Sequence, residues 1–374
     1  MPDPTTIVAY DVFRIRIPLR TPYHLSKVYG TLTHSDVLIL RVETSGGAVG
    51  WGEADPGGKK FTGDSPKSAM AAVREGAWSY LKGLNLEAWA GEQQGLRRHG
   101  SLGAAADVAI HDALGRLSGV PVWKLLGEKR RDQVEVLWPT SSGTAAEDLE
   151  VIRTYAQKGF RTFMLKMGDR PINEDLDRIR EVIAQAPEDV RVMADANQGW
   201  TREEASTFLE GLRELPVILV EQPLPADDLE GLRGLRQRGT PISVDESLQN
   251  PESAEQILQA EAADVFSIKI SKNGGLQNSL AIGQAVAAKG QRILMNSMIE
   301  LGITQSASLH LGGVLPGLMD CGHAYMSTLR MSDDITDFSD WVTQGTANLP
   351  DLPGLGVTVD EEKIQKYLED EFHG

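Results

Sequence analysis

From about Val134 onward, short apolar runs alternate with amphipathic stretches, and this alternation limits the fold more than any other feature of the sequence. The runs are VEVLWP, TFMLKMG, VRVMADAN, VILVEQP, PISVDES, VFSIKIS, RILMNSM and GLMDCG. Stretches with apolar residues at helical spacing lie between them, among them AEDLEVIRTYAQKG and NEDLDRIREVIAQA. Strands and helices that alternate at this pace predict parallel βαβ units. Eight such strands in about 190 residues predict a closed (β/α)8 barrel. The alternative is an open doubly wound sheet, but the sequence has no glycine-rich dinucleotide motif to support it.

The first 130 residues have a different pattern, which is typical of an α+β domain. YDVFRIRIPL is a predicted strand, and SDVLILRVETSGGAVGWGEA is a predicted hairpin with its turn at Ser45–Gly47. The helical stretches SPKSAMAAVREGAWSYLKGL and AAADVAIHDALGRLSG follow. We therefore predict three parts: residues 1–130 form an α+β domain, residues 131–330 form the barrel, and residues 331–374 return to the first domain.

Charge and cysteine content exclude some classes of partner. The net charge of −16 argues against nucleic acid or an anionic membrane as the main partner. Cys321 is the single cysteine, so the chain has no intrachain disulfide, as in proteins of a reducing compartment. No run approaches the roughly 20 apolar residues of a membrane span, and the first residues lack a signal-peptide pattern. We expect a soluble, cytoplasmic protein.

Carboxylates stand at the ends of three consecutive predicted strands. Asp195, Glu221 and Asp245 follow one another at spacings of 26 and 24 residues, which is one βαβ unit each. In such a barrel the carboxyl ends of the strands meet at one face, so these three side chains are expected to face one point. Like charges at that separation need a cation between them, and oxygen ligands suit Mg²⁺. The alternative is that each carboxylate caps the helix that follows it.

Two lysines end the predicted strands on either side of this trio. Lys166 ends the second run and Lys269 ends the sixth, and these strands lie roughly opposite one another in a barrel. Two lysines in that position can reach both faces of one substrate carbon. Burial and a nearby metal would each lower the lysine pKa toward the range of a base near neutral pH. The alternative for a single lysine is a charge that extends from the strand end into solvent.

Taken in order, these motifs resemble the enolase superfamily, and within it the muconate lactonizing enzyme subgroup. The resemblance extends over nearly the whole chain and rests on GWGEA, AAADVAIHDALGRLSGVPVWKLLGE, LKMG, DANQGW, VEQPL, VDES, IKISKNGG and NSMIELGITQSASLHL. It implies a modified (β/α)7β barrel under an N-terminal α+β capping domain. It also implies Mg²⁺ bound by Asp195, Glu221 and Asp245, and removal of the proton α to a substrate carboxylate through an enediolate intermediate.

The resemblance also assigns individual residues. Lys166 and Lys269 match the two acid/base lysines of the family. Glu300 matches an acidic residue that helps to place the substrate carboxylate, as a protonated hydrogen-bond donor. Asn197 and Glu246 match polar residues beside the metal ligands, and Asn197 is also expected near the substrate.

The sequence departs from the family pattern at two places. The subgroup has Lys-x-Lys at the end of the second strand, whereas this chain has Met164 in place of the first lysine. Lys166 therefore lacks one neighbouring positive charge. Dipeptide epimerases of the subgroup have Asp-x-Asp after the last strand, and here the sequence is Asp320-Cys321-Gly322. The second departure weakens the case for a dipeptide substrate, and Met164 argues against transferring a relative's substrate to this chain.

Two loops of the capping domain are expected to contact the distal end of the substrate. The first contains Tyr23 and Lys27, and the second comprises residues 54–63. After the last strand, Asp320 is a further candidate contact.

Opposed lysines favour racemisation or epimerisation of an amino-acid-like acid. The same scaffold also supports a cycloisomerase or a dehydratase, and a different class of hypothesis is a barrel that binds metal and carboxylate without catalysis. In each case we expect a small carboxylate ligand, and the resemblance implies a homo-oligomer.

Overall fold

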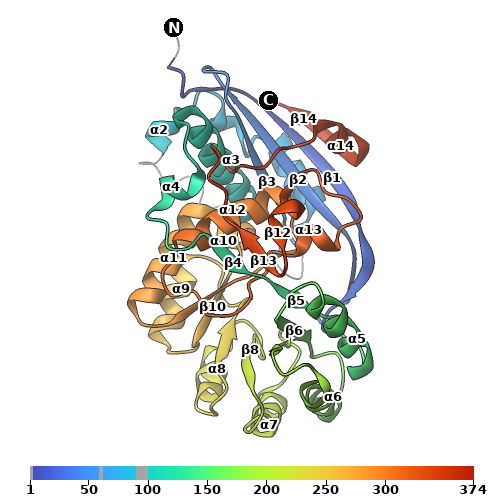
Figure 1. Cartoon of the computed structure of the whole chain (residues 1–374). Helices are drawn as coiled ribbons and strands as arrows, with labels where there is room; N and C mark the ends of the chain where they lie inside the picture. Colours follow the sequence, from blue (N-terminus) through green and yellow to red (C-terminus); the bar gives the residue numbers. More distant parts are fainter. Residues whose placement is uncertain (1–2, 59–61, 90–99) are drawn as a thin grey trace.

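A computed structural model describes residues 3–58, 62–89 and 100–374. An antiparallel sheet with helices on one side lies above a curled parallel sheet whose helices form an outer layer (Figure 1). The predicted fold class, a modified TIM barrel under an N-terminal α+β domain, is confirmed.

The upper sheet has the strand order β14-β1-β2-β3. Its members are β1 (Ile7–His24), β2 (Thr31–Thr44), β3 (Val49–Ala54) and β14 (Leu368–His373). The predicted hairpin is present as β2 and β3, and Gly47 in its turn has φ 82°. The C-terminal segment returns to this sheet, where β14 pairs with β1.

The helix α3 (Gly100–Ser118) packs against β3 at very close range. A Cβ atom at Gly52 would lie 1.9 Å from the carbonyl oxygen of Ala105, and one at Gly50 would lie 2.1 Å from that of Ala109. The glycines of GWGE are therefore needed for this approach. The other predicted helix is interrupted: α1 (Pro66–Arg74) ends before Gly76, where φ is 95°, and a 3-10 turn, η1 (Ser79–Leu81), follows. The short helices α2 (Leu86–Trp89) and α4 (Val122–Leu126) complete this part.

The parallel sheet has seven strands in the order β11-β10-β9-β8-β7-β6-β5. They are β5 (Leu137–Pro139), β6 (Thr162–Lys166), β7 (Arg191–Asp195), β8 (Val217–Glu221), β9 (Ile242–Val244), β10 (Val265–Ile268) and β11 (Arg292–Met295). The helices that follow these strands are α5 (Ala145–Ala156), α6 (Ile172–Gln185), α7 (Arg202–Gly211), α8 (Leu229–Arg236), α9 (Pro251–Gln259), α10 (Ile270–Asn273), α11 (Leu276–Ala288) and α12 (Gly302–Val314). Leu, Ile, Val, Phe and Ala side chains from strands and helices form one large core between the two layers.

Two of the eight predicted strands differ from expectation. The run VEVLWP is divided: β4 (Gln133–Glu135) joins a separate small sheet with β13 (Thr346–Asn348) and β12 (Val342–Thr343), and only β5 belongs to the barrel. The run GLMDCG forms no extended strand. Instead, single bridges of Leu318 with Ile293 and of His323 with Val136 connect β11 to the chain just before β5.

The capping domain is fastened to the barrel by a buried carboxylate. Glu53, on β3, accepts hydrogen bonds from the backbone amides of Leu301 (2.7 Å) and Thr304 (3.0 Å) at the start of α12.

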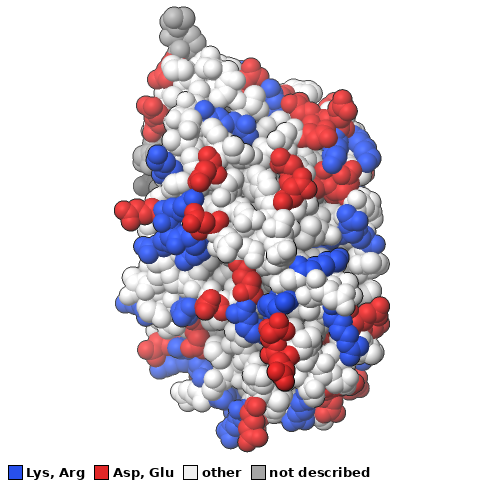
Figure 2. Space-filling view, in the orientation of Figure 1, with Lys and Arg blue, Asp and Glu red and all other residues white. Residues whose placement is uncertain are grey.

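The remaining C-terminal elements are α13 (Ser327–Arg330), η3 (Phe338–Trp341) and α14 (Glu361–Lys366). Among the described residues, no helix has the length and apolar character that a membrane crossing requires. On the face shown in Figure 2, acidic and basic side chains are interspersed, without a continuous basic surface.

Candidate active site

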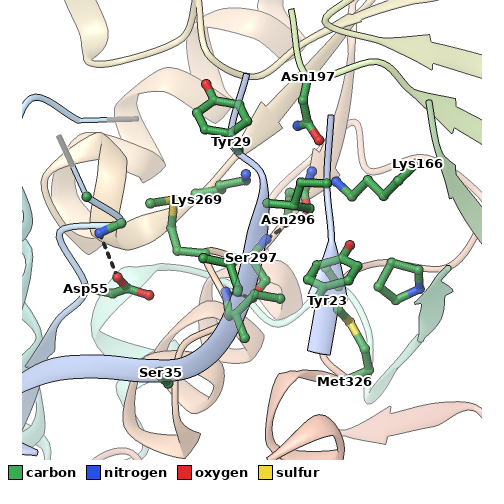
Figure 3. Close-up of a pocket in the computed structure, with 18 of the residues that line it drawn as sticks. Tyr23, Tyr29, Ser35, Asp55, Lys166, Asn197, Lys269, Asn296, Ser297 and Met326 are labelled. Carbon is green, nitrogen blue, oxygen red and sulfur yellow. Dashed lines mark hydrogen bonds between the residues drawn. The ribbon is translucent and has the colours of Figure 1, made fainter. Parts of the chain in front are cut away.

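A cavity of about 400 Å³ lies between the capping domain and the carboxyl ends of the barrel strands. Most of its wall is apolar, and a few polar groups converge on it, which is the usual character of a small-molecule site. The polar lining residues that matter most here are Tyr23, Tyr29, Asp55, Lys166, Lys269 and Ser297. Both domains thus contribute to one cavity (Figure 3).

The three predicted metal ligands come together beneath this cavity. Asp195 is the last residue of β7, Glu221 is the last residue of β8, and Asp245 directly follows β9. All three side chains are fully buried, and the β7–β8 pairing places Asp195 opposite Glu221.

Each carboxylate has its own hydrogen-bond donors in this structure. The ammonium group of Lys166 forms an ion pair with Asp195, and that of Lys269 lies 2.6 Å from Oδ2 of Asp245. Glu221 accepts hydrogen bonds from Asn296 Nδ2 (2.8 Å) and from the hydroxyl of Ser267. Within residues 3–58, 62–89 and 100–374, no three His, Cys, Asp or Glu side chains are arranged as a ready metal site.

The chemistry of the donor set nevertheless fits a hard divalent cation. Burial, and then the negative charges of Asp195 and Asp245, raise the pKa of Glu221 well above its ordinary range. The carboxylates are therefore close enough to repel one another, and a shared cation would relieve that repulsion. Asn197 Oδ1, which is buried beside them, accepts no hydrogen bond from any residue in the described part of the chain.

The two predicted lysines approach the same space from opposite sides. In Figure 3 the ammonium groups of Lys166 and Lys269 point toward each other across the base of the cavity. Both side chains are buried. Burial, the largest single effect, lowers the pKa of Lys166, as predicted, but the negative charges of Asp195, Tyr23 and Glu221 together outweigh it and the pKa is raised. The pKa of Lys269 is raised in the same way, because the charges of Asp245, Glu221 and Glu246 together outweigh burial.

Three further predicted residues surround the carboxylates. Glu300 lies behind the cavity wall, where it accepts a hydrogen bond from Ser297 Oγ at 2.5 Å. Burial raises the pKa of Glu300, which favours a protonated carboxyl group. Asn197 Nδ2 bonds Asp195 Oδ2 at 3.1 Å and approaches Glu246 Oε1 at 3.4 Å. Burial, and then the charge of Asp245, raise the pKa of Glu246 to about 8.

Of the remaining predicted residues, some line the cavity and others lie away from it. Met164 and Tyr23 line the cavity, and the Tyr23 ring lies 3.9 Å from the guanidinium carbon of Arg330. Lys27 is exposed and does not line the cavity. Asp320 is not brought to the site: its carbonyl oxygen accepts a hydrogen bond from Arg191, the first residue of β7, so it lies at the opposite end of the strands. In the second capping loop, residues 59–61 lie outside the described part of the chain.

Three residues of the site region were not singled out from the sequence. Lys272 Nζ lies 2.6 Å from Asp245 Oδ1, and the motif IKISKNGG places it three residues after Lys269 on the same short helix. Arg178 on α6 bonds the carbonyl oxygen of Lys166 at 2.7 Å. Asp55 follows β3 and lines the cavity. Lys272 could have been found from its spacing to Lys269, and Asp55 belongs to the capping loop of residues 54–63 that was expected near the substrate, whereas Arg178 meets the site only through the tertiary fold.

Fold and site together define a capped TIM-barrel enzyme with a buried acidic centre between two lysines. The comparisons with known proteins agree with this class. The sequence matches the Mandelate racemase / muconate lactonizing enzyme N-terminal domain over residues 7–127 and the Enolase C-terminal domain-like family over residues 147–363. The chain belongs to this family, the muconate lactonizing enzyme-like branch of the enolase superfamily, and is an isomerase of that superfamily.

Its relatives include enzymes with different reactions. L-Ala-D/L-Glu epimerase of Bacillus subtilis (strain 168) is 30% identical over 94% of this chain and 96% of its own. Muconate cycloisomerase 1 of Rhodococcus opacus is 31% identical over 97% of this chain and 98% of its own. The crystal structure of N-succinyl Arg/Lys racemase from Bacillus cereus ATCC 14579 has a TM-score of 0.92 at 26% identity and covers 99% of this chain and 100% of that one.

Proposed function

We propose that this protein racemises or epimerises an amino-acid-like carboxylic acid by moving the α-proton between two lysines. The observation that carries the proposal is the placement of Lys166 and Lys269, whose ammonium groups point toward each other across the base of one cavity. A substrate carbon held between them would present one face to each lysine, as inversion of configuration requires.

In this proposal each lysine has a defined task. The neutral lysine on one side removes the α-proton, and the protonated lysine on the other side returns a proton to the opposite face. The starting enantiomer decides which of the two acts first. Lys166 is the last residue of β6 and Lys269 directly follows β10, so the sheet fixes the positions of both.

The other residues of the site bind and orient the substrate and the metal ion in this proposal. We propose that Glu300, with Ser297 in front of it, holds the substrate carboxylate, and that Asp195, Glu221 and Asp245 would hold Mg²⁺. When bound, that ion would supply Lewis acidity for the negative charge that develops on the substrate carboxylate. The apolar wall of the cavity, Met164 included, keeps water away from the reacting carbon.

A second candidate is cycloisomerisation, in which one lysine transfers the proton and the other is only electrostatic. The 31% identity to a muconate cycloisomerase supports cycloisomerisation as a second hypothesis. The two candidates differ in one outcome, because only racemisation or epimerisation exchanges the α-proton of both configurations of one acid.

The test is deuterium uptake at the α-carbon in D₂O with Mg²⁺, using both enantiomers of a library of N-acyl amino acids and dipeptides. We expect uptake from both enantiomers by the unaltered protein, and loss when a chelator removes divalent cations. Lys166→Ala and Lys269→Ala should each reduce uptake by about a thousandfold or more. Lys289→Ala, a change at an exposed lysine at the C-terminal end of α11, should leave it unchanged. Undiminished exchange of both enantiomers in either site variant would show that the lysine assignment is wrong.

A further inference from the structure

Asp55 is a buried carboxylate of the cavity that the proton-transfer mechanism does not use. It directly follows β3 and is 6% exposed. Oδ1 accepts a hydrogen bond from the backbone amide of Gly57 at 2.8 Å, which fixes the side chain at the cavity wall (Figure 3).

Asp55 has no basic partner among the residues that the structure describes, and this separates it from the other carboxylate of the wall. Asp36 also lines the cavity, but Arg14 holds it with two hydrogen bonds of 2.9 and 2.7 Å. Under the cavity, Asp195 and Asp245 are likewise paired with lysines. Of the two acidic residues that line the cavity, Asp55 is therefore the one without an ion pair to a described basic side chain, and the charge of Lys269 offsets its charge only weakly.

An unmatched carboxylate in this position has an energetic cost. Burial, and then the nearby charge of Glu300, raise the pKa of Asp55 well above its ordinary range. A positive group arriving in the cavity would offset both effects, because it replaces the lost hydration and opposes the neighbouring negative charge.

The cavity therefore has charge of opposite sign in two places. Figure 3 shows Asp55 at one side of the cavity and Lys166 at the other, with Lys269 and Ser297 in the space between. A substrate that presents a carboxylate to the base of the cavity can extend a second group toward Asp55. That group would lie away from Lys166 and from the carbon that reacts.

We propose that Asp55 is a specificity-determining residue that binds a cationic nitrogen group of the substrate, a protonated amine or a guanidinium. The substrate class is then a carboxylic acid with an exchangeable α-proton and a distal positive charge. This inference rests on the proposed function for the identity of the site, and it adds the charge of the distal group.

The test compares acids that differ only in distal charge: N-acetyl-lysine, neutral N-acetyl-norleucine, and anionic N-acetyl-2-aminoadipate. Each is measured by α-deuterium exchange, giving kcat/KM, and by calorimetric titration, giving Kd, in the presence of Mg²⁺. We expect the unaltered protein to prefer the cationic acid over the neutral one by about tenfold to a hundredfold. Asp55→Asn should remove this preference, because kcat/KM falls and Kd rises for the cationic acid. For the neutral acid, both quantities should change by less than about threefold.

Asp36→Asn is the matched control, since it removes a cavity carboxylate that Arg14 already neutralises. This variant should change kcat/KM and Kd by the same factor for the cationic and the neutral acid. A preference of the unaltered protein for the neutral or anionic acid, which needs no variant to observe, would overturn the inference, and so would an intact cationic preference in Asp55→Asn. Binding preference without any exchange would support Asp55 and refute the proposed function. Exchange without a charge preference would support the proposed function and refute the role of Asp55.

Discussion

At the scale of single residues, Arg178 fixes the strand end that presents Lys166. Its guanidinium forms a bidentate pair with the buried carboxylate of Asp148 at 2.6 and 2.9 Å. The same group donates to the carbonyl oxygens of Lys166 (2.7 Å) and Ser141 (2.8 Å). One side chain thus connects α5, α6 and the end of β6, and its hydrogen bonds to Asp148 and Lys166 are buried.

Removing this guanidinium should be costly. Arg178→Ala leaves Asp148 buried without its partner, so we expect the free energy of unfolding to fall by about 3–5 kcal/mol. Urea denaturation followed by circular dichroism measures this change. Arg180→Ala, two residues further along the same helix, removes an arginine with a half-exposed side chain and should cost less than about 0.5 kcal/mol. Equal losses in the two variants would contradict the role given to Arg178.

The carboxylates and lysines could be predicted from the sequence because each one ends a strand or directly follows it. Where a strand ends, the barrel geometry itself decides where the side chain points. Asp320 shows the limit of that rule. The chain around it forms single bridges instead of a strand, so the residue lies near Arg191 at the other end of the barrel. Arg178 had no strand-end position, and only the packing of α6 against the barrel brings it to the site. Asp55 follows β3 in a capping loop that was expected near the substrate, but only the packing of the two domains brings this particular side chain to the cavity.

At the scale of secondary-structure elements, glycines decide how closely strands and helices can approach. A Cβ at Gly52 would meet the backbone of α3 at 1.9 Å, and a backbone contact cannot be relieved by rotating a side chain. A Cβ at Gly234, within α8, would have no heavy atom within 4 Å. The same substitution should therefore have opposite effects at these two positions.

We expect Gly52→Ala to destabilise the protein by about 1–3 kcal/mol, because β3 and α3 must separate to admit the methyl group. Gly234→Ala should stabilise it by about 0.5–1 kcal/mol, because alanine loses less conformational entropy in a helix. Urea midpoints of the two variants, measured together, check both signs. A neutral Gly52→Ala would mean that the close packing of α3 on β3 is not required.

The order of the barrel elements was predictable, but some of their boundaries were not. Strand and helix alternation placed β6 to β11 correctly, since each has a buried apolar run followed by a polar residue. The run VEVLWP looked continuous, yet it serves two sheets, and its pairing partner β13 lies about 200 residues further along the chain. Such long-range pairing leaves no trace in a local pattern.

At the scale of the whole molecule, Glu53 couples the stability of the two-domain structure to pH. Its carboxylate bonds the first amides of α12, an interaction that favours the ionised form. Burial opposes ionisation more strongly, and Glu300 and Asp334 add negative charge nearby, so the pKa of Glu53 is raised from 4.5 to about 8. An acid whose pKa is higher in the folded state stabilises that state less as it ionises. The contribution of Glu53 is therefore largest below about pH 4.5 and declines as the pH rises to about 8.

Glu53→Gln removes this titration, while Glu300 and Asp334 remain in both proteins. We expect the stability of the unaltered protein relative to Glu53→Gln to fall between pH 5 and pH 8, by at most about 1.4 kcal/mol per pH unit. Urea denaturation at several pH values in this range measures the difference. Glu150→Gln, at an exposed position on α5, should show no such trend. If the advantage of the unaltered protein instead grew as the pH rose, the two amides of α12 would outweigh burial. The domains would then be joined by an ionised carboxylate at the end of a helix rather than by a neutral acid.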